Sequence, residues 1–308
     1  METRRIGSLE VSVLGLGCGS LGAMVDETGA RAIVAAAREQ GVTFFDLSDR
    51  QVAAEEWVGR AVRSSRDEVV LATKFGSRVA PGVEACAAPA HVRAAVDRSL
   101  RRLGTDRIDL YQLHRPDPAT PIADTLGALA QLVAAGKVRE IGCSKFSADQ
   151  LLEAEAAASS GVRFVSVQNR LNLLEPGDAQ SVLPVCERLG IAYVPYCPLA
   201  GGLLTGKYER GRPPPAGTRF AEWDRWRARV PEWLTAENFD RLDRLAAWAR
   251  EHGRSLVELA FAFLLAHRPV ATVIAGASSP AHVERNAAAC GSWHLEPDEL
   301  AELELLAG

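Results

Sequence analysis

Eight short apolar runs, each followed by a segment with helical periodicity, predict an α/β protein folded as a (β/α)8 TIM barrel. Alternating strands and helices are typical of βα units in a parallel sheet. Eight such units are the number that closes this barrel. Glycines that stop helices follow four of the helical segments, at Gly41, Gly104, Gly136 and Gly190.

The individual elements can be assigned in chain order from these patterns. The predicted strands are residues 11–17, 42–46, 69–74, 108–114, 138–144, 164–168, 192–196 and 270–276. The predicted barrel helices are residues 30–40, 55–63, 90–103, 123–135, 148–158, 179–189, 255–266 and 280–289. Further helices are expected at 236–251 and 298–306. An N-terminal hairpin of residues 4–6 and 10–12 around Gly7-Ser8 is expected to plug the bottom of the barrel.

A long insertion, residues 199–234, follows the seventh strand and interrupts the regular alternation. A loop of this length inside a compact domain is usually functional or disordered. It carries the aromatic residues Phe220, Trp223, Trp226 and Trp233. One interpretation is a mobile flap rich in Arg and Pro, and the other is a lid whose Trp223 and Trp226 contact a substrate.

Composition sets outer limits on function. The chain has 308 residues, is 47% hydrophobic and 24% charged, and carries a formal net charge of −4. We expect one globular domain over residues 1–308, with no nucleic-acid or anionic-membrane partner. The longest apolar run, residues 259–266, is too short to cross a bilayer. Six scattered cysteines without C-x-x-C spacing predict reduced cytoplasmic thiols and no metal site.

Three ionisable residues end consecutive predicted strands: Asp46, Lys74 and His114. Active sites of this barrel lie at the C-terminal ends of the strands, so these side chains are expected to share one rim. A carboxylate beside an ammonium forms a charged pair, and a neutral imidazole can orient a polar substrate group. We therefore expect a catalytic site for a small molecule here.

Seven motifs in order extend this interpretation over nearly the whole chain: FFDLSD, LATKFG, DLYQLHRPD, GKVREIGCSKFS, VQNRLNLL, YCPLAGGLLTGKY and VIAGASSPAHVERN. Their order resembles the aldo-keto reductase superfamily, in its bacterial form. The resemblance implies a (β/α)8 barrel that binds NADPH, or less often NADH, in an extended form. It also implies that Asp46, Lys74 and His114 are three of the family's four catalytic residues.

The fourth catalytic residue of the resemblance, a tyrosine, is absent. The position five residues after Asp46 holds Gln51, and no tyrosine lies between Met1 and Lys74. Reduction of a C=O group leaves an alkoxide that must be protonated, which is the role of the family's tyrosine. An amide can donate a hydrogen bond to a developing oxyanion but cannot supply a proton. His114, Lys74 or water would then have to supply it.

The resemblance also assigns the cofactor site. Ser144 and Gln168 would hold the nicotinamide carboxamide, and Tyr196 would stack on the ring. Lys145 and Cys197 stand where relatives have Asn and Ser. The further residues implied are Gly19, Pro198, Leu199, Gly201, Leu203, Lys207, Gly276, Ala277, Ser278, His282, Arg285 and Asn286. His282 and Arg285 favour NADPH over NADH, because they could bind the additional phosphate.

Three functions remain open. The first is an NAD(P)H-dependent oxidoreductase acting on a C=O, C=N or conjugated C=C group of a small molecule. The second is a redox-neutral dehydratase or epimerase that uses the same site. The third is a noncatalytic nicotinamide-binding protein, against which the retention of Asp46, Lys74 and His114 argues. The sequence gives no indication of the oligomeric state.

Overall fold

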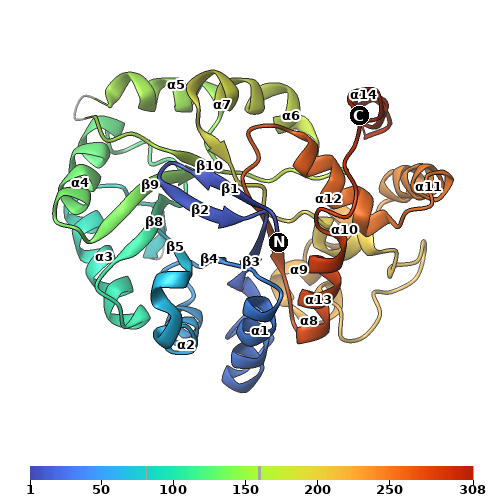
Figure 1. Ribbon diagram of the computed structural model, residues 1–308, viewed down its shortest axis with the longest axis horizontal. Helices are drawn as coiled ribbons and strands as arrows, with labels where there is room; N and C mark the ends of the chain where they lie inside the picture. Colours follow the sequence, from blue (N-terminus) through green and yellow to red (C-terminus); the bar gives the residue numbers. More distant parts are fainter. Residues whose placement is uncertain (81, 159–160, 308) are drawn as a thin grey trace.

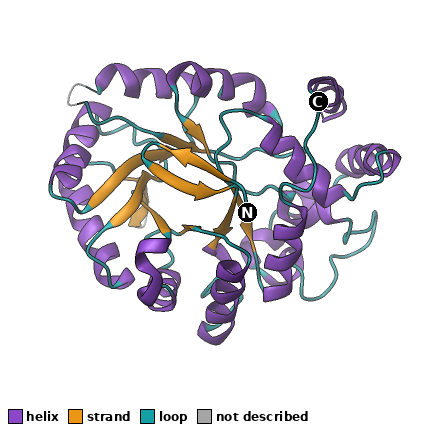
Figure 2. Cartoon of the chain, viewed as in Figure 1, coloured by secondary structure: helices purple, strands orange, loops and turns teal. Residues whose placement is uncertain are grey.

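The computed structural model describes residues 1–80, 82–158 and 161–307, and its helices surround a barrel of parallel strands (Figures 1 and 2). In space the strands follow the order β11-β10-β9-β8-β5-β4-β3-β12. Parallel bridges from Tyr193 to Val270 and from Tyr196 to Ile274 join the two ends of this sheet. The barrel strands are β3 (Leu14–Gly17), β4 (Phe44–Asp46), β5 (Val70–Phe75), β8 (Ile108–Leu113), β9 (Val138–Ser144), β10 (Ser166–Gln168), β11 (Ala192–Tyr193) and β12 (Val273–Gly276).

A helical segment follows every barrel strand, which confirms the predicted (β/α)8 fold. These helices are α1 (Glu27–Glu39), α2 (Val52–Ala61), α3 (Pro89–Leu103), α4 (Ile122–Ala134), α5 (Ala148–Ala157), α6 (Gly177–Ser181), α7 (Leu183–Leu189), α12 (Leu256–Ala266) and α13 (Pro280–Ala289). The single helix expected at 179–189 is two helices, because Pro184 lies in the first turn of α7, where its missing N–H is tolerated. Within the described ranges, no helix has the length and apolarity to cross a bilayer.

The N-terminal hairpin closes one end of the barrel, as expected. Strands β1 (Thr3–Ile6) and β2 (Leu9–Ser12) pair antiparallel, and Figure 1 shows them lying across the barrel opening. Ile6, Leu9 and Val11 pack in one apolar cluster with the barrel residues Phe44 and Leu110. The first barrel strand is shorter than the predicted residues 11–17, because Val11 belongs to the hairpin instead.

Two regions differ from the expected pattern. A second hairpin, β6 (Ser77–Ala80) with β7 (Val83–Ala85), follows the third barrel strand and was not predicted. The insertion is not one extended loop. It contains the 3-10 helix η3 (Ala200–Thr205) and three short helices, α8 (Arg219–Glu222), α9 (Asp224–Arg227) and α10 (Val230–Trp233). The expected outer helices are α11 (Ala236–Glu251) and α14 (Pro297–Ala307), beside each other in Figure 1.

Candidate active site

One cavity of about 1630 Å³ opens at the C-terminal ends of the barrel strands. It receives side chains from the ends of β4, β5, β9 and β10 and from the segments after β8, β11 and β12. All the residues predicted for the site line this cavity, with the exception of Leu203. The barrel therefore brings together residues that lie far apart in the sequence.

The centre of the site is a buried ion pair. The Lys74 Nζ donates to Asp46 Oδ1 at 2.6 Å and to the Leu47 carbonyl at 2.8 Å. Gln168 Nε2 donates to the same carboxylate oxygen at 2.8 Å. Lys74 is 4% exposed and Asp46 is 8% exposed. Removing one partner from such a pair leaves a buried charge uncompensated, so the pair holds both side chains in place.

His114 follows β8 and lines the cavity beside this pair. Burial lowers the pKa of His114 to about 2. The positive charges that lower this pKa further belong to Lys74, Lys145, Arg50 and Arg115. At neutral pH the imidazole is therefore uncharged, and its Nδ1 is buried with no hydrogen-bond partner among the described residues. A neutral ring can orient a substrate through a hydrogen bond but holds no extra proton to release.

Gln51 is the residue immediately before α2 and lines the cavity. Its side chain reaches toward the 3-10 helix η1 (Cys18–Ser20), since its Nε2 lies 3.3 Å from the point where a Cβ would stand on Gly19. Close packing against α3 also fixes the C-terminal part of α2. A Cβ on Gly59 would lie 2.1 Å from the Leu103 carbonyl oxygen, so only glycine lets α2 approach the end of α3 this closely.

The segment after β11 has an unusual backbone. Cys197 has a φ of 59° and Ala200 a φ of 47°, and they are followed by Gly201 at 70° and Gly202 at 104°. These left-handed residues kink η3, so that its backbone borders the cavity. Leu203, by contrast, does not line the cavity, because its side chain lies in the apolar core, where it is 1% exposed.

The nicotinamide end of the predicted cofactor site lies along β9, β10 and the segment after β11. Ser144 and Gln168 are buried, Tyr196 is half-buried, and Lys145 is exposed. Lys145 has a φ of 62°, a conformation in which Asn is the best tolerated residue after Gly. The Arg170 guanidinium lies 5.7 Å from the Tyr196 ring centre.

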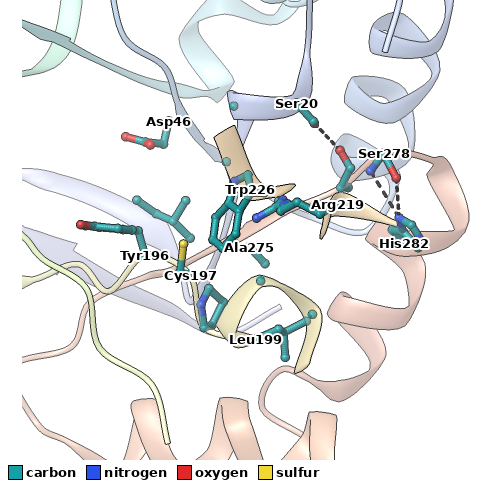
Figure 3. A pocket seen from close by; sticks show the side chains of 18 of the residues that line it. Ser20, Asp46, Tyr196, Cys197, Leu199, Arg219, Trp226, Ala275, Ser278 and His282 are labelled. Carbon is teal, nitrogen blue, oxygen red and sulfur yellow. Dashed lines mark hydrogen bonds between the residues drawn. The ribbon is translucent and has the colours of Figure 1, made fainter. Parts of the chain in front are cut away.

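A group of basic side chains gathers at the opposite end of the cavity. Lys207 follows η3, His282 and Arg285 lie on α13, and Arg219 begins α8. Burial and then the charges of Arg219 and Arg285 lower the pKa of Lys207. Burial, followed by the charges of all three cations, lowers the pKa of His282. His282 Nδ1 also lies 3.0 Å from the Ser278 hydroxyl (Figure 3). This arrangement fits an anion at the N-terminus of α13.

Arg219 was not predicted. It lies in the insertion, and nothing in its local sequence indicates that α8 folds back toward β12. Its guanidinium is 5.1 Å from the Trp226 ring centre, and Figure 3 shows the two side chains stacked over the cavity. A Cβ on Gly276 would lie 2.8 Å from Arg219 Nη2.

The insertion is held by an aromatic cluster. Trp226 is 3% exposed and packs edge-on against Phe220, with ring centres 5.4 Å apart. Its ring centre lies 5.9 Å from that of Trp233. A Cβ on Gly201 would lie 2.8 Å from Trp226. Both Trp223 and Trp226 line the cavity, but Trp226 is mainly packed into the insertion, whereas Trp223 is half-buried at its edge.

Comparisons with known proteins agree with this geometry. The family model described as "Aldo/keto reductase family" matches residues 13–307. An L-glyceraldehyde 3-phosphate reductase of Escherichia coli K12 is 32% identical over 285 residues, covering 89% of this chain and 82% of that protein. A probable aldo-keto reductase of Glycine max is 33% identical over 290 residues, covering 90% and 80%.

A solved structure agrees over the full length of the chain. The holo form of an aldo-keto reductase from Bacillus halodurans is 34% identical, covers 100% of this chain and 97% of its own, and has a TM-score of 0.81. The match extends from the first barrel strand to the last helix, so it includes every element that contributes to the cavity. The chain belongs to the aldo/keto reductase family.

Proposed function

We propose that this protein is an NADPH-dependent oxidoreductase that reduces a C=O or C=N group of a small molecule without a tyrosine acid. The observation that carries the proposal is the buried Asp46–Lys74 pair beside a neutral His114, in one cavity with the basic group of Lys207, Arg219 and Arg285. Reduction of a conjugated C=C group remains within the same chemistry.

The residues present fit a nicotinamide cofactor. The cavity is long enough to contain both the ion pair and the distant basic group, and the backbone of η3 borders it between them. Three cations and the N-terminus of α13 suit the phosphates. Arg285 and His282 would favour the additional phosphate of NADPH, while Ser144, Gln168 and Tyr196 would hold the nicotinamide. When bound, this group supplies a hydride to the substrate carbon.

The chain's own residues would then manage the charge that develops on the substrate oxygen or nitrogen. Lys74 has three N–H donors, and Asp46 and Leu47 accept two of them. The third is available to a substrate oxygen. Gln51 and the uncharged His114 add neutral hydrogen bonds. Stabilising an oxyanion in a buried site is a large contribution to catalysis, even where no side chain transfers a proton.

Candidate substrates differ in whether the site must supply a proton. The depressed pKa of His114 argues against this ring as the acid at neutral pH. An alkoxide would have to take its proton from Lys74 or from water. An iminium substrate already carries its proton, so the site is better matched to C=N reduction than to reduction of simple aldehydes.

Cofactor binding can be tested separately from turnover. Titrating NADPH and NADH while following tryptophan fluorescence should give saturable binding, with NADPH bound more tightly. Arg285→Ala should weaken NADPH binding by roughly tenfold and leave NADH binding nearly unchanged, because one charged phosphate contact is lost. Arg268→Ala, an exposed arginine outside the cavity, is the matched control. Equal affinity of the wild type for both cofactors would disprove recognition of the additional phosphate.

We also infer a cytoplasmic location and no nucleic-acid partner. None of the six described cysteines forms a disulfide, which is typical of a reducing compartment. The formal net charge of −4 does not suit a polyanion.

A further inference from the structure

Two adjacent residues after β11, Tyr196 and Cys197, form part of the cavity wall and lie next to each other in Figure 3. Tyr196 presents a half-buried aromatic ring, and Cys197 has a left-handed φ of 59°. A residue other than glycine keeps such a conformation only where the surrounding structure holds it. The contacts that hold this Tyr196–Cys197 segment come from residues 169–175, which follow β10.

Asn172 contacts the backbone of the Tyr196–Cys197 segment. It is 0% exposed, and its Nδ2 donates to the Cys197 carbonyl and to Glu175 Oε2, both at 3.2 Å. Its Oδ1 accepts from the backbone N–H groups of Leu174 and Glu175, at 2.9 and 3.1 Å. An asparagine amide has two N–H donors and one carbonyl acceptor, so every polar group of this side chain has a partner. The buried amide is therefore fixed in one orientation, with one of its N–H groups on the Cys197 carbonyl.

Arg170 contacts the aromatic ring of the same segment. Its guanidinium lies 5.7 Å from the Tyr196 ring centre and 5.6 Å from the Trp233 ring centre, and both distances are within the range of cation–π attraction. Burial raises the pKa of the Tyr196 hydroxyl, while the charge of Arg170 and a hydrogen bond to it oppose this rise. One guanidinium thus joins the ring in the cavity wall to α10 of the insertion.

Glu175 connects these two contacts. Its Oε1 accepts from Arg170 at 3.0 Å, and its Oε2 accepts from Asn172. The carboxylate therefore binds both side chains that hold the Tyr196–Cys197 segment, one with each oxygen. Arg170 lines the cavity, but neither Asn172 nor Glu175 is among the described residues that do. Because a partly exposed ion pair contributes little stability by itself, the main effect of this carboxylate is to orient its two partners.

We propose that Glu175 is a positioning residue for the cofactor: through Arg170 and Asn172 it holds the Tyr196–Cys197 segment as the surface on which the nicotinamide ring packs. This proposal rests on the proposed function, because it requires that the cavity binds NADPH. Aromatic rings attract each other in specific relative orientations, so a ring that is free to tilt loses part of the contact. Glu175 would then act on the nicotinamide from outside the cavity.

Two ligands that differ only in the nicotinamide test the proposal. They are NADPH and phospho-ADP-ribose, which is NADPH without its nicotinamide ring. In Glu175→Gln the side chain keeps its size, but its amide nitrogen would face one of the two donors, Arg170 or Asn172. By calorimetry, this variant should bind NADPH about three- to tenfold more weakly than wild type, which is the contribution of an aromatic stacking contact. Its affinity for phospho-ADP-ribose should change by less than about twofold, because that ligand has no ring to stack.

Glu155→Gln is the matched control for the loss of a paired carboxylate. Glu155 pairs with Arg163 at 2.9 Å, and neither residue is among the described ones that line the cavity. The side chain of Glu155 is 32% exposed, close to the 38% of Glu175. This control should leave the affinities for both ligands unchanged.

Fluorine NMR without any ligand reports on the Tyr196 ring directly. The chain has four tyrosines, so labelling with fluorotyrosine gives a simple spectrum, in which Tyr196→Phe identifies the Tyr196 signal. Glu175→Gln should shift or broaden this signal, because the ring loses its fixed neighbour. The signal of Tyr111, which lies on β8, should stay in place and shows that the variant is folded. Arg170→Met removes the other half of the ion pair and should repeat both results, which provides a second variant if Glu175→Gln does not fold.

Each unfavourable result has a distinct meaning. An unmoved Tyr196 signal in both variants would overturn the proposal, and so would an unchanged NADPH affinity or an equal loss of affinity for the two ligands. These results would leave the proposed function intact, since wild type would still bind NADPH. Failure of wild type to bind NADPH would refute the proposed function itself, and the role of Glu175 with it.

Discussion

Replacing Gln51 by tyrosine should add a phenol acid to the proposed site. The new ring would enter the cavity beside Gly19, where the Gln51 amide now lies 3.3 Å from the position of an absent Cβ. Because Gly19 has no side chain, the bulkier phenol has room there. The neighbouring Lys74 ammonium would lower the phenol's pKa and favour proton release.

The expected gain follows from two opposing effects. A positioned general acid contributes about 10²–10⁴-fold to the rate. The segment between Asp46 and Glu55 is about two residues shorter than in the tyrosine-containing pattern that it resembles, and a displacement of about an ångström can cost on the order of 100-fold. The net expectation for Gln51→Tyr is therefore a gain of about tenfold in reduction of a simple aldehyde.

The assay follows loss of the NADPH absorbance with para-nitrobenzaldehyde, for wild type, Gln51→Tyr and Gln51→Ala. Wild type should be slow, and the Tyr variant should gain an alkaline limb in its pH profile as the phenol titrates. Gln51→Phe is the matched control, because it has the same ring without the hydroxyl and should show no gain. Brisk reduction by wild type, unchanged in Gln51→Ala, would refute this reasoning. Lys74 would then be the first acid to test, followed by His114 through His114→Ala.

Three further predictions concern the groups around this site. In urea titrations, Lys74→Met should lower the free energy of unfolding by about 3–5 kcal/mol, because it leaves the buried Asp46 charge unpaired. Adding Asp46→Asn should restore part of the lost stability. A loss below about 1 kcal/mol in Lys74→Met would contradict the pairing argument. The pKa of His114 is about 2 in the fold, against about 6.5 unfolded. The contribution of His114 to the free energy of unfolding should thus fall by about 1.4 kcal/mol per pH unit as the pH drops below 6.5. His114→Asn should reduce the slope of the free energy of unfolding against pH. Equal slopes in wild type and variant would mean that the ring is charged in the fold. Trp226→Ala should lower the free energy of unfolding by about 3–5 kcal/mol and expose the insertion to limited proteolysis. Trp223→Ala should mainly raise the substrate KM. Equal proteolysis of the two variants would contradict this distinction.

The strand ends show how far the sequence could predict the site. Alternation alone placed Asp46, Lys74 and His114 at the C-terminal ends of consecutive strands, and the barrel brings these ends to one rim. The hydrogen bond from Gln168 to Asp46 joins residues 122 positions apart. It depends on how the whole barrel closes, so no local pattern could predict it.

The insertion and η3 show why the remaining features were missed. Arg219 reaches the cavity because Trp226 packs over Gly201 and turns α8 back toward β12. That contact is tertiary and leaves no periodic signal in the sequence. Leu203 was assigned to the site from a motif match, but the backbone turn at Gly201 and Gly202 rotates its side chain into the core. A motif identifies a segment, whereas the backbone decides which of its side chains face the ligand.

Transfer of a labelled hydride tests the central claim most directly. Purified protein would be incubated with an aldehyde or an imine and with NADPH that carries deuterium at the transferable position of its nicotinamide ring. The product would then be analysed by mass spectrometry. The account predicts one deuterium in each product molecule and one NADPH consumed per product. Product without deuterium and without loss of NADPH would establish a redox-neutral reaction, and bound NADPH without any product would indicate a noncatalytic role.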